Sequence, residues 1–168
     1  MNYKTLNLLV KNKKFLDKKI NFYIKKKILT NTTSRYEIQG HIEKSRHNLS
    51  FLNEITKNYN DWSLVVCYYA IYHSALALIL SKNFHSKNHD ATICVLIKEF
   101  YNKELTKEDI DLLNMFNLQD ILFYVDAKNK REEANYSTKI KFEPDEIKKI
   151  KIKTILFVNK AEAILKHS

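Results

Sequence analysis

Three short stretches hold the residues best suited to chemistry, and the last of them, Lys128–Thr138, places a single arginine before an asparagine and a tyrosine. If a helix continues into this stretch, Arg131 and Asn135 share one face, and Tyr136 turns toward the core side. An arginine guanidinium binds phosphate through two parallel hydrogen bonds. Spacing alone predicts a helix end that carries a cation, and nothing more specific.

The second stretch places Tyr69 and His73 four residues apart in an apolar sequence, with Tyr68 and Tyr72 beside them. Side chains at this spacing are neighbours on a helix. Several tyrosine hydroxyl groups and the imidazole of His73 would therefore enter the core on the same helix. A buried hydrogen-bond network and a ligand pocket are both compatible with this pattern.

The remaining stretch lies between these two in the sequence and contains His85 and His89, also four residues apart. No cysteine pair or carboxylate stands at partner spacing, and Asn88 or Ser86 suits a helix N-cap, so we expect no metal site. The only glycine is Gly40, which excludes a glycine-rich loop for phosphates. No Ser-His-acid or Cys-His arrangement follows from spacing, and no cofactor is expected.

The elements that must position these residues are helices. One glycine and one proline in 168 residues are too few for the turns of a β protein. Periodicity and capping signals predict an all-α, antiparallel up-and-down bundle of about five to six helices. The predicted helical stretches are about 3–29, a stretch begun by Ser34 with Glu37 in a capping box, 62–80, a short one through 91–97, one capped by Thr106 with Asp109, a restart after Asn117, and a last one from Pro144.

The stretch Trp62–Leu80 has no Lys, Arg, Asp or Glu over nineteen residues, which is close to the length of a membrane span. Tyrosines and His73 lie in its middle, where lipid would penalise them. Ala70, Ser74 and Ala77 form a small-residue stripe suited to close helix packing. A central buried helix is the preferred interpretation, with no transmembrane segment, and a membrane span is the alternative.

The net charge of +10 is concentrated near the start of the chain, since residues 1–40 contain ten Lys and Arg against two acids. We therefore divide the chain into a basic amphipathic helical arm, 1–30, and a helical bundle domain, 31–168. Such an arm could attract phosphate or an anionic surface, or it could merely solubilise the chain. Cys67 and Cys94 lie in apolar surroundings and no signal peptide precedes them, so we expect reduced thiols and a cytoplasmic protein.

The three stretches together resemble the HEPN superfamily (higher eukaryotes and prokaryotes nucleotide-binding domain), and most closely its small stand-alone archaeal and bacterial branch. That branch has a Tyr-Tyr-Ala-x-x-His helix, then Lys-x-His at the start of the next helix, then Arg-Glu-x-Ala-Asp-Tyr. The resemblance covers about 35–166. The matching residues here are Tyr68, Tyr69, Ala70, His73, Lys87, His89, Arg131, Glu132, Ala134, Asn135 and Tyr136.

The resemblance implies a helical bundle, usually a homodimer, and a site that binds nucleotide or RNA. Some members are toxins silenced by a nucleotidyltransferase partner. Many are ribonucleases with the motif Arg, four to six residues, then His. The residues expected to contact nucleotide or RNA are Arg131, Asn135, Tyr136, Tyr69, His73, Lys87 and His89.

The chain departs from the ribonuclease motif, because Tyr136, Ser137 and Thr138 occupy the places where the histidine would stand. A tyrosine hydroxyl with an ordinary pKa near 10 is a poor acid–base group at neutral pH. Arg131, Tyr136 and His73 are therefore catalytic candidates without an assigned role. Three hypotheses follow: an RNA- or nucleotide-binding protein with a degenerate site, an active ribonuclease toxin using His73 or His89, and an adaptor for a protein or membrane surface.

Overall fold

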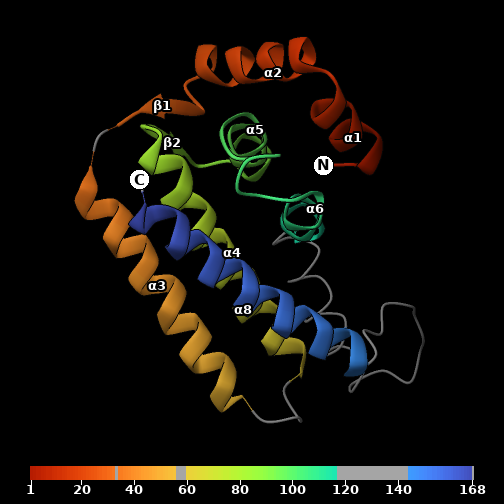
Figure 1. Cartoon of the computed structure of the whole chain (residues 1–168), viewed down its shortest axis with the longest axis vertical. Coiled ribbons are helices and arrows are strands. Elements are labelled where there is room, and N and C mark those ends of the chain that lie inside the picture. The colour runs from red at the N-terminus through yellow and green to blue at the C-terminus, as the bar shows by residue number, and fades with distance from the viewer. Residues whose placement is uncertain (33, 56–59, 117–143, 168) are drawn as a thin grey trace, which may run out of the picture.

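The computed structural model describes residues 1–32, 34–55, 60–116 and 144–167, and these contain seven helices and two short strands (Figure 1). The predicted all-α bundle is confirmed. Arg131, Asn135 and Tyr136 lie outside the described residues. The elements are α1 (Tyr3–Lys11), α2 (Lys13–Lys25), β1 (Leu29–Asn31), α3 (Arg35–Glu54), α4 (Asn60–Ser81), β2 (Phe84–Ser86), α5 (His89–Glu99), α6 (Lys107–Met115) and α8 (Pro144–Lys166).

The core is built around α4, which packs against both α3 and α8 (Figure 1). Helix α3 runs antiparallel to the other two. The stripe predicted for close packing is fully buried, since Ala70, Ser74 and Ala77 have no exposed surface. Small side chains let helix backbones approach closely, so this stripe places the polar groups of α3 directly against those of α4.

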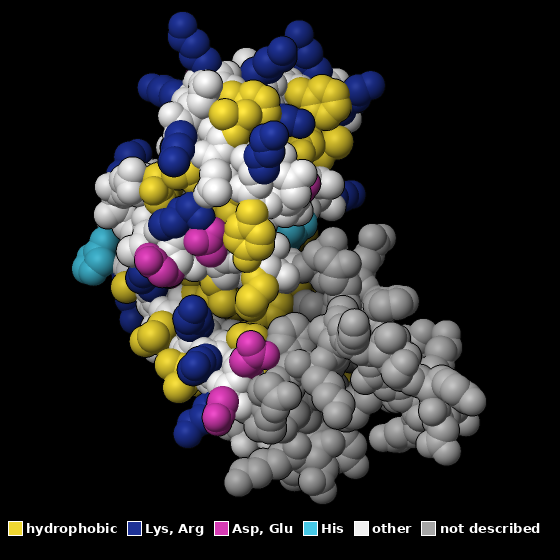
Figure 2. Space-filling model, turned by 90° about the vertical axis from the view of Figure 1, so that its right-hand side faces the viewer, with side chains coloured by type: hydrophobic (Ala, Val, Ile, Leu, Met, Phe, Trp, Pro, Cys, Tyr) yellow, Lys and Arg dark blue, Asp and Glu magenta, His cyan; other side chains and the backbone are white. Residues whose placement is uncertain are grey.

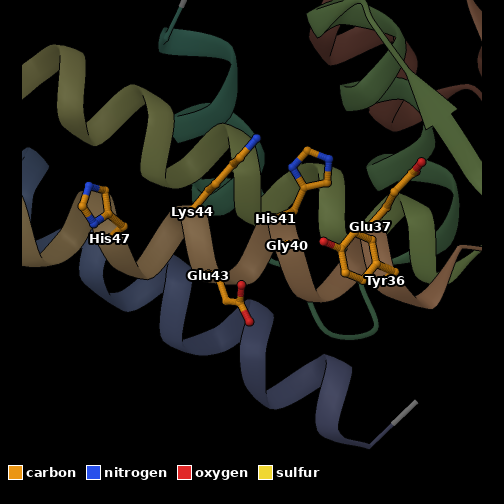
Figure 3. A pocket seen from close by; sticks show the side chains of 7 residues that line it. All are labelled: Tyr36, Glu37, Gly40, His41, Glu43, Lys44 and His47. Carbon is orange, nitrogen blue, oxygen red and sulfur yellow. The ribbon is translucent and has the colours of Figure 1, made fainter.

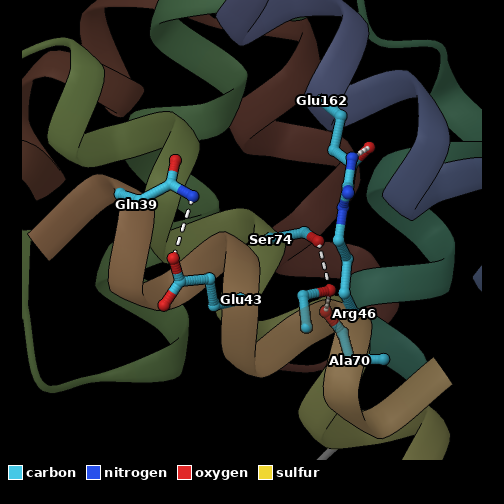
Figure 4. Close-up of polar contacts among 7 residues, drawn as sticks. Gln39, Glu43, Arg46, Ala70, Ser74 and Glu162 are labelled. Carbon is cyan, nitrogen blue, oxygen red and sulfur yellow. Dashed lines mark hydrogen bonds and ion pairs between the residues drawn. The ribbon is translucent and has the colours of Figure 1, made fainter. Parts of the chain in front are cut away.

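Polar contacts fix the position of α3 on its two neighbours (Figure 4). The buried Ser45 hydroxyl donates to the Ala70 carbonyl oxygen at 2.7 Å and bonds the Ser74 hydroxyl at the same distance. On the surface, the Arg46 guanidinium donates two hydrogen bonds to the Glu162 carboxylate, at 2.5 and 2.7 Å. Both contacts hold the helix that carries His41.

Helix termini follow the predicted caps. The Ser34 hydroxyl accepts from the Glu37 backbone N–H, which is one of the two hydrogen bonds of the predicted capping box, and Asn88 caps α5 through the N–H of Ala91. Thr106 and Asp109 form a complete capping box at the start of α6. Such local signals are readable from sequence because each is satisfied within one turn of helix.

The first predicted helix, 3–29, is divided in the structure. Asn12 has extended backbone angles, ends α1, and caps α2 by accepting from the Phe15 N–H. The apolar face continues across this break, because Leu6, Leu9, Leu16 and Ile20 are all buried. Both helices contact α5. The division of the chain at residue 30 stays a prediction.

A two-stranded antiparallel ribbon was not expected from the sequence. It pairs β1 with β2 in the register Leu29↔Ser86, Thr30↔His85 and Asn31↔Phe84. Lys27 (φ 55°) and Asn83 (φ 64°) take left-handed backbone angles just before the two strands. The ribbon thereby joins the segment after α2 to the segment between α4 and α5.

The apolar helix that raised the question of a membrane span forms the centre of the bundle. Trp62–Ser81 is long and apolar enough to cross a membrane, yet 83% of its most apolar window is buried inside the protein. The core helix of a globular protein has the same length and composition. Cys67, on this helix, and Cys94 are buried free thiols, as predicted.

Candidate functional site

The antiparallel packing of α3 on α4 brings together two histidines, His41 and His73. Their Nδ1 atoms lie 2.9 Å apart, and their ring centroids are separated by 5.1 Å. Both side chains are half-buried. One turn away the buried Ser45–Ser74 contact fixes the same helix crossing, so the histidine pair sits on a rigid support.

Both histidines are neutral at pH 7. Burial, His41 and the Lys44 ammonium together lower the pKa of His73 to about 4. Burial and Lys44 also lower the pKa of His41, with a smaller contribution from His85 in the same direction and an opposing one from Glu37. Neither ring is therefore a fixed cation.

A neutral pair joined through Nδ1 has a definite chemical consequence. One Nδ1–H donates to the other Nδ1, so the donor ring has an unprotonated Nε2 and the acceptor ring a protonated one. In the described part of the chain, no hydrogen bond occupies either Nε2. The pair thus offers one proton acceptor and one proton donor to a ligand.

Aromatic side chains of α4 surround the pair. The ring of Tyr69 is stacked on that of His73 with centroids 6.3 Å apart, and 37% of Tyr69 is exposed. Tyr68 and Tyr72 stack on each other at 5.5 Å, and burial raises the pKa of both phenols. Exposed Tyr69 can stack on a base or ribose, whereas Tyr68 is part of the core.

The Lys-x-His pair at the start of α5 divides between surface and interior. Lys87 is exposed. The Nε2–H of His89 donates to the Leu113 carbonyl oxygen at 2.9 Å, and the ring lies about 6 Å from those of Tyr68 and Tyr72. Burial lowers the pKa of His89. Through these contacts His89 connects α5 to α4 and α6.

Known proteins give a direct comparison. No family model matches the chain. It is 35% identical over 119 residues to a Methanocaldococcus jannaschii protein named "Putative toxin MJ0605", with 64% of this chain and 83% of that protein covered. The chain belongs to the family of that protein. The chain is also similar to a second protein from the same organism, "Putative toxin MJ0142", at 25% identity over 130 residues, covering 77% of this chain and 82% of that protein.

In this chain, His41 lines a surface depression of about 520 Å³ along α3. Figure 3 shows that α3 alone supplies its lining side chains, with His41 and Lys44 on one side of the helix and Glu43 on the other. Gly40 lies in its middle, and a Cβ built there would meet no atom within 4 Å. The glycine is therefore not required by packing against a neighbour.

Of the residues predicted for the site, the structure brings Tyr69 and His73 together and places Lys87 on the surface. The reasoning from sequence missed His41. The available signal was that His41 and Ser45 lie on the face of the predicted helix that also carries Leu49 and Leu52. Polar residues on a core face require a partner on the neighbouring helix.

Among the described residues, no three His, Cys, Asp or Glu side chains are close enough together to hold a metal ion. The side chains described at the histidine pair and its depression carry imidazole, phenol, ammonium and carboxylate groups.

The histidine pair predicts acid sensitivity. An unfolded chain protonates His73 near pH 6.5, whereas the folded protein does so only near pH 4. Stability is therefore complete above pH 6.5 and is lost as pH falls toward 4. With partial exposure allowed for, the loss attributable to His73 should be about 2 kcal/mol. Urea unfolding at pH 7 and pH 4.5 measures it.

The control for this experiment is the exposed His47, two turns along α3 from His41. The variant His73→Asn should lose less stability between the two pH values than the wild type, while His47→Asn should lose as much as the wild type. Equal losses in all three proteins would contradict the lowered pKa of His73.

Proposed function

We propose that the protein is the toxin of a toxin–antitoxin pair and that it acts by binding RNA or nucleotide. Its membership of a family whose members are named as toxins carries the first half of this proposal. The second half rests on chemistry. A neutral histidine pair, an exposed tyrosine ring and Lys44 lie together beside a depression of about 520 Å³, and such groups suit bases and phosphates.

We also propose that the chain is a HEPN protein. The order and spacing of Tyr68–His73, Lys87–His89 and Arg131–Tyr136 support this, and the helical bundle is compatible with it. On this proposal, Arg131 binds a phosphate with Asn135 on the same face. The missing histidine after Arg131 favours binding over cleavage at that position.

The proposal includes partners. An antitoxin is expected for any toxin of this kind, and a nucleotidyltransferase is the class that the HEPN resemblance favours. A homodimer follows from the same resemblance. A cytoplasmic location is proposed on other grounds, the buried free thiols of Cys67 and Cys94. The proposed antitoxin can be tested by co-expression with a nucleotidyltransferase encoded beside this chain. The co-expressed partner should restore growth.

The central test combines growth and RNA binding. Induced expression of the full chain in bacteria should arrest growth, and the purified protein should bind a fluorescent single-stranded RNA with affinity that falls as salt rises. Arg131→Ala should weaken binding at least about tenfold, since it removes charge-assisted hydrogen bonds, and should relieve the growth arrest.

The matched control is Lys130→Ala, which removes a neighbouring charge that cannot form the bidentate contact. It should reduce affinity only slightly. Normal growth with wild-type protein, together with no RNA binding at low salt, would refute the proposed function.

A second candidate function is favoured by one observation, the Nδ1–Nδ1 contact of His41 and His73. A proton acceptor and a proton donor side by side are what cleavage of RNA by its own 2′-hydroxyl requires, because one group removes the hydroxyl proton and the other protonates the leaving oxygen. The alternative is therefore a ribonuclease toxin whose acid–base groups are these two histidines.

A further inference from the structure

A second depression, separate from the one along α3, lies where the ribbon meets the start of α5. It has a volume of about 530 Å³, and its lining residues are Lys27, Ile28, Thr30, His85, Lys87 and Asn88. No acidic residue contributes to this lining. Two lysines and a histidine from segments almost sixty positions apart in sequence thus converge on one cavity.

The ribbon explains why these side chains face outward together. Leu29 and its partner Ser86 are buried. Successive side chains of a strand point to opposite faces, so the next pair in register, Thr30 and His85, points away from the core. Directly paired residues on one face are close neighbours, which places a hydroxyl beside an imidazole.

The two lysines are placed by the turns at the ends of the ribbon. Lys27 has a left-handed φ of 55° where the chain leaves α2 for β1. Lys87 follows β2 and precedes the N-cap of α5. Both are exposed, and among the described residues neither ammonium forms an ion pair or hydrogen bond. Their charges are available to a ligand.

The remaining polar groups complete an anion-binding set. The Asn88 side-chain oxygen is occupied by the Ala91 N–H, which leaves the amide nitrogen as a donor. The Thr30 hydroxyl and the His85 imidazole can each donate one further hydrogen bond. Ammonium groups with several short donors are typical of phosphate recognition.

This cavity lies close enough to the histidine pair for the two to interact electrostatically, since the charge on His85 contributes to the lowered pKa of His41. Lys44, on the surface of α3, acts on both histidines of the pair. Besides burial, Lys44 and His85 thus lower the pKa of His41 while Glu37 raises it, which links the cavity and the histidine pair electrostatically.

We propose that the cavity lined by Lys27, Thr30, His85 and Lys87 is a phosphate subsite, and that it binds the RNA backbone next to the His41–His73 pair. The RNA part of this inference rests on the proposed function. The subsite itself rests on the ribbon register and the convergence of unpaired cations. The basic segment before α3 then has a particular role, which is to supply Lys27 and Thr30 to the ligand.

The test uses the full chain, a fluorescent single-stranded RNA, and two double variants with the same change in charge. Lys27→Gln with Lys87→Gln removes both cations of the cavity. Lys13→Gln with Lys18→Gln removes two exposed cations of α2. The cavity variant should bind RNA about tenfold more weakly, and the slope of log affinity against log salt should fall by about 1.4. The α2 variant should change neither by much.

A second measurement uses inorganic phosphate and the NMR signals of the histidine rings. Phosphate and RNA should each shift the His85 signals in a saturable way, while those of exposed His167, at the end of α8, should stay unchanged. The cavity variant should abolish the phosphate effect.

The outcomes separate the subsite from the proposed function. Equal weakening of RNA binding by both double variants, or RNA binding that leaves His85 unchanged, would overturn the subsite and leave the proposed function standing. A saturable phosphate effect at His85 without any RNA binding would support the subsite as an anion site and refute the RNA-binding function.

Discussion

Replacement of Phe157 by alanine should lower the free energy of unfolding by about 3–5 kcal/mol, because a large side chain leaves the core and a cavity remains. Phe157 is 1% exposed and belongs to the core cluster shared by α8 and α4. Since small domains are stable by only about 5–15 kcal/mol, this one change removes a large part of the total. Urea denaturation monitored by circular dichroism measures it.

The neighbouring residue gives a matched control. Leu156 is 61% exposed, so Leu156→Ala should change stability by less than about 0.5 kcal/mol. Similar losses for the two variants would mean that the face of α8 has been assigned incorrectly. A loss confined to Phe157 would support α8 and α4 as a single packed unit that positions the histidine pair.

The second large effect concerns the ribonuclease alternative. If the histidine pair performs acid–base catalysis, His73→Ala should reduce RNA cleavage by about 10²- to 10⁴-fold. His41→Ala should have an effect of similar size, because each ring fixes the proton of the other. Single-turnover cleavage of a fluorescent RNA in the presence of a chelator measures this rate.

Two further observations decide between loss of chemistry and loss of binding. RNA affinity, measured by anisotropy, should remain within a few-fold of wild type in His73→Ala, and a variant of the exposed His167 at the end of α8, His167→Ala, should cleave at the wild-type rate. Wild-type protein that leaves RNA intact under these conditions would eliminate the ribonuclease alternative while leaving RNA binding untouched.

Much of the fold could be predicted because its signals are local. Caps at Ser34, Asn88 and Thr106 are formed within one helical turn. The apolar stretch around Ala70 and Ser74 identifies the central helix by composition alone. These features depend on residues close in sequence, so periodicity and capping rules reach them.

The ribbon and the division at Asn12 could not be predicted in the same way. Three residues per strand carry too little pattern to distinguish β1 from a loop, and its stability depends on a partner more than fifty positions away. Asn12 interrupts a continuous apolar face, so the hydrophobic period passes through the break without a change. The capping role of Asn12 is shown only by the hydrogen bond that its side-chain oxygen accepts from the Phe15 N–H in the structure.

The same distinction between local and long-range signals applies to the candidate site. Tyr69 and His73 were found because they lie on one helix at helical spacing. His41 was missed because its partner lies 32 positions away, and only the packing of α3 on α4 brings the two together. The predictions for Arg131, Asn135 and Tyr136 lie outside the described residues.

The Lys-rich end of the molecule is visible in Figure 2, where Lys and Arg side chains stand out with hydrophobic side chains between them. Its apolar residues Leu6, Leu9, Leu16 and Ile20 are part of the same core as α5. Deletion of the residues before α3 would remove α1 and α2, which pack against α5. It would also remove β1, the strand with which β2 pairs, and the backbone groups of β2 left unpaired would be a template for aggregation. The role of these lysines is therefore better dissected by charge-removing substitutions than by deletion.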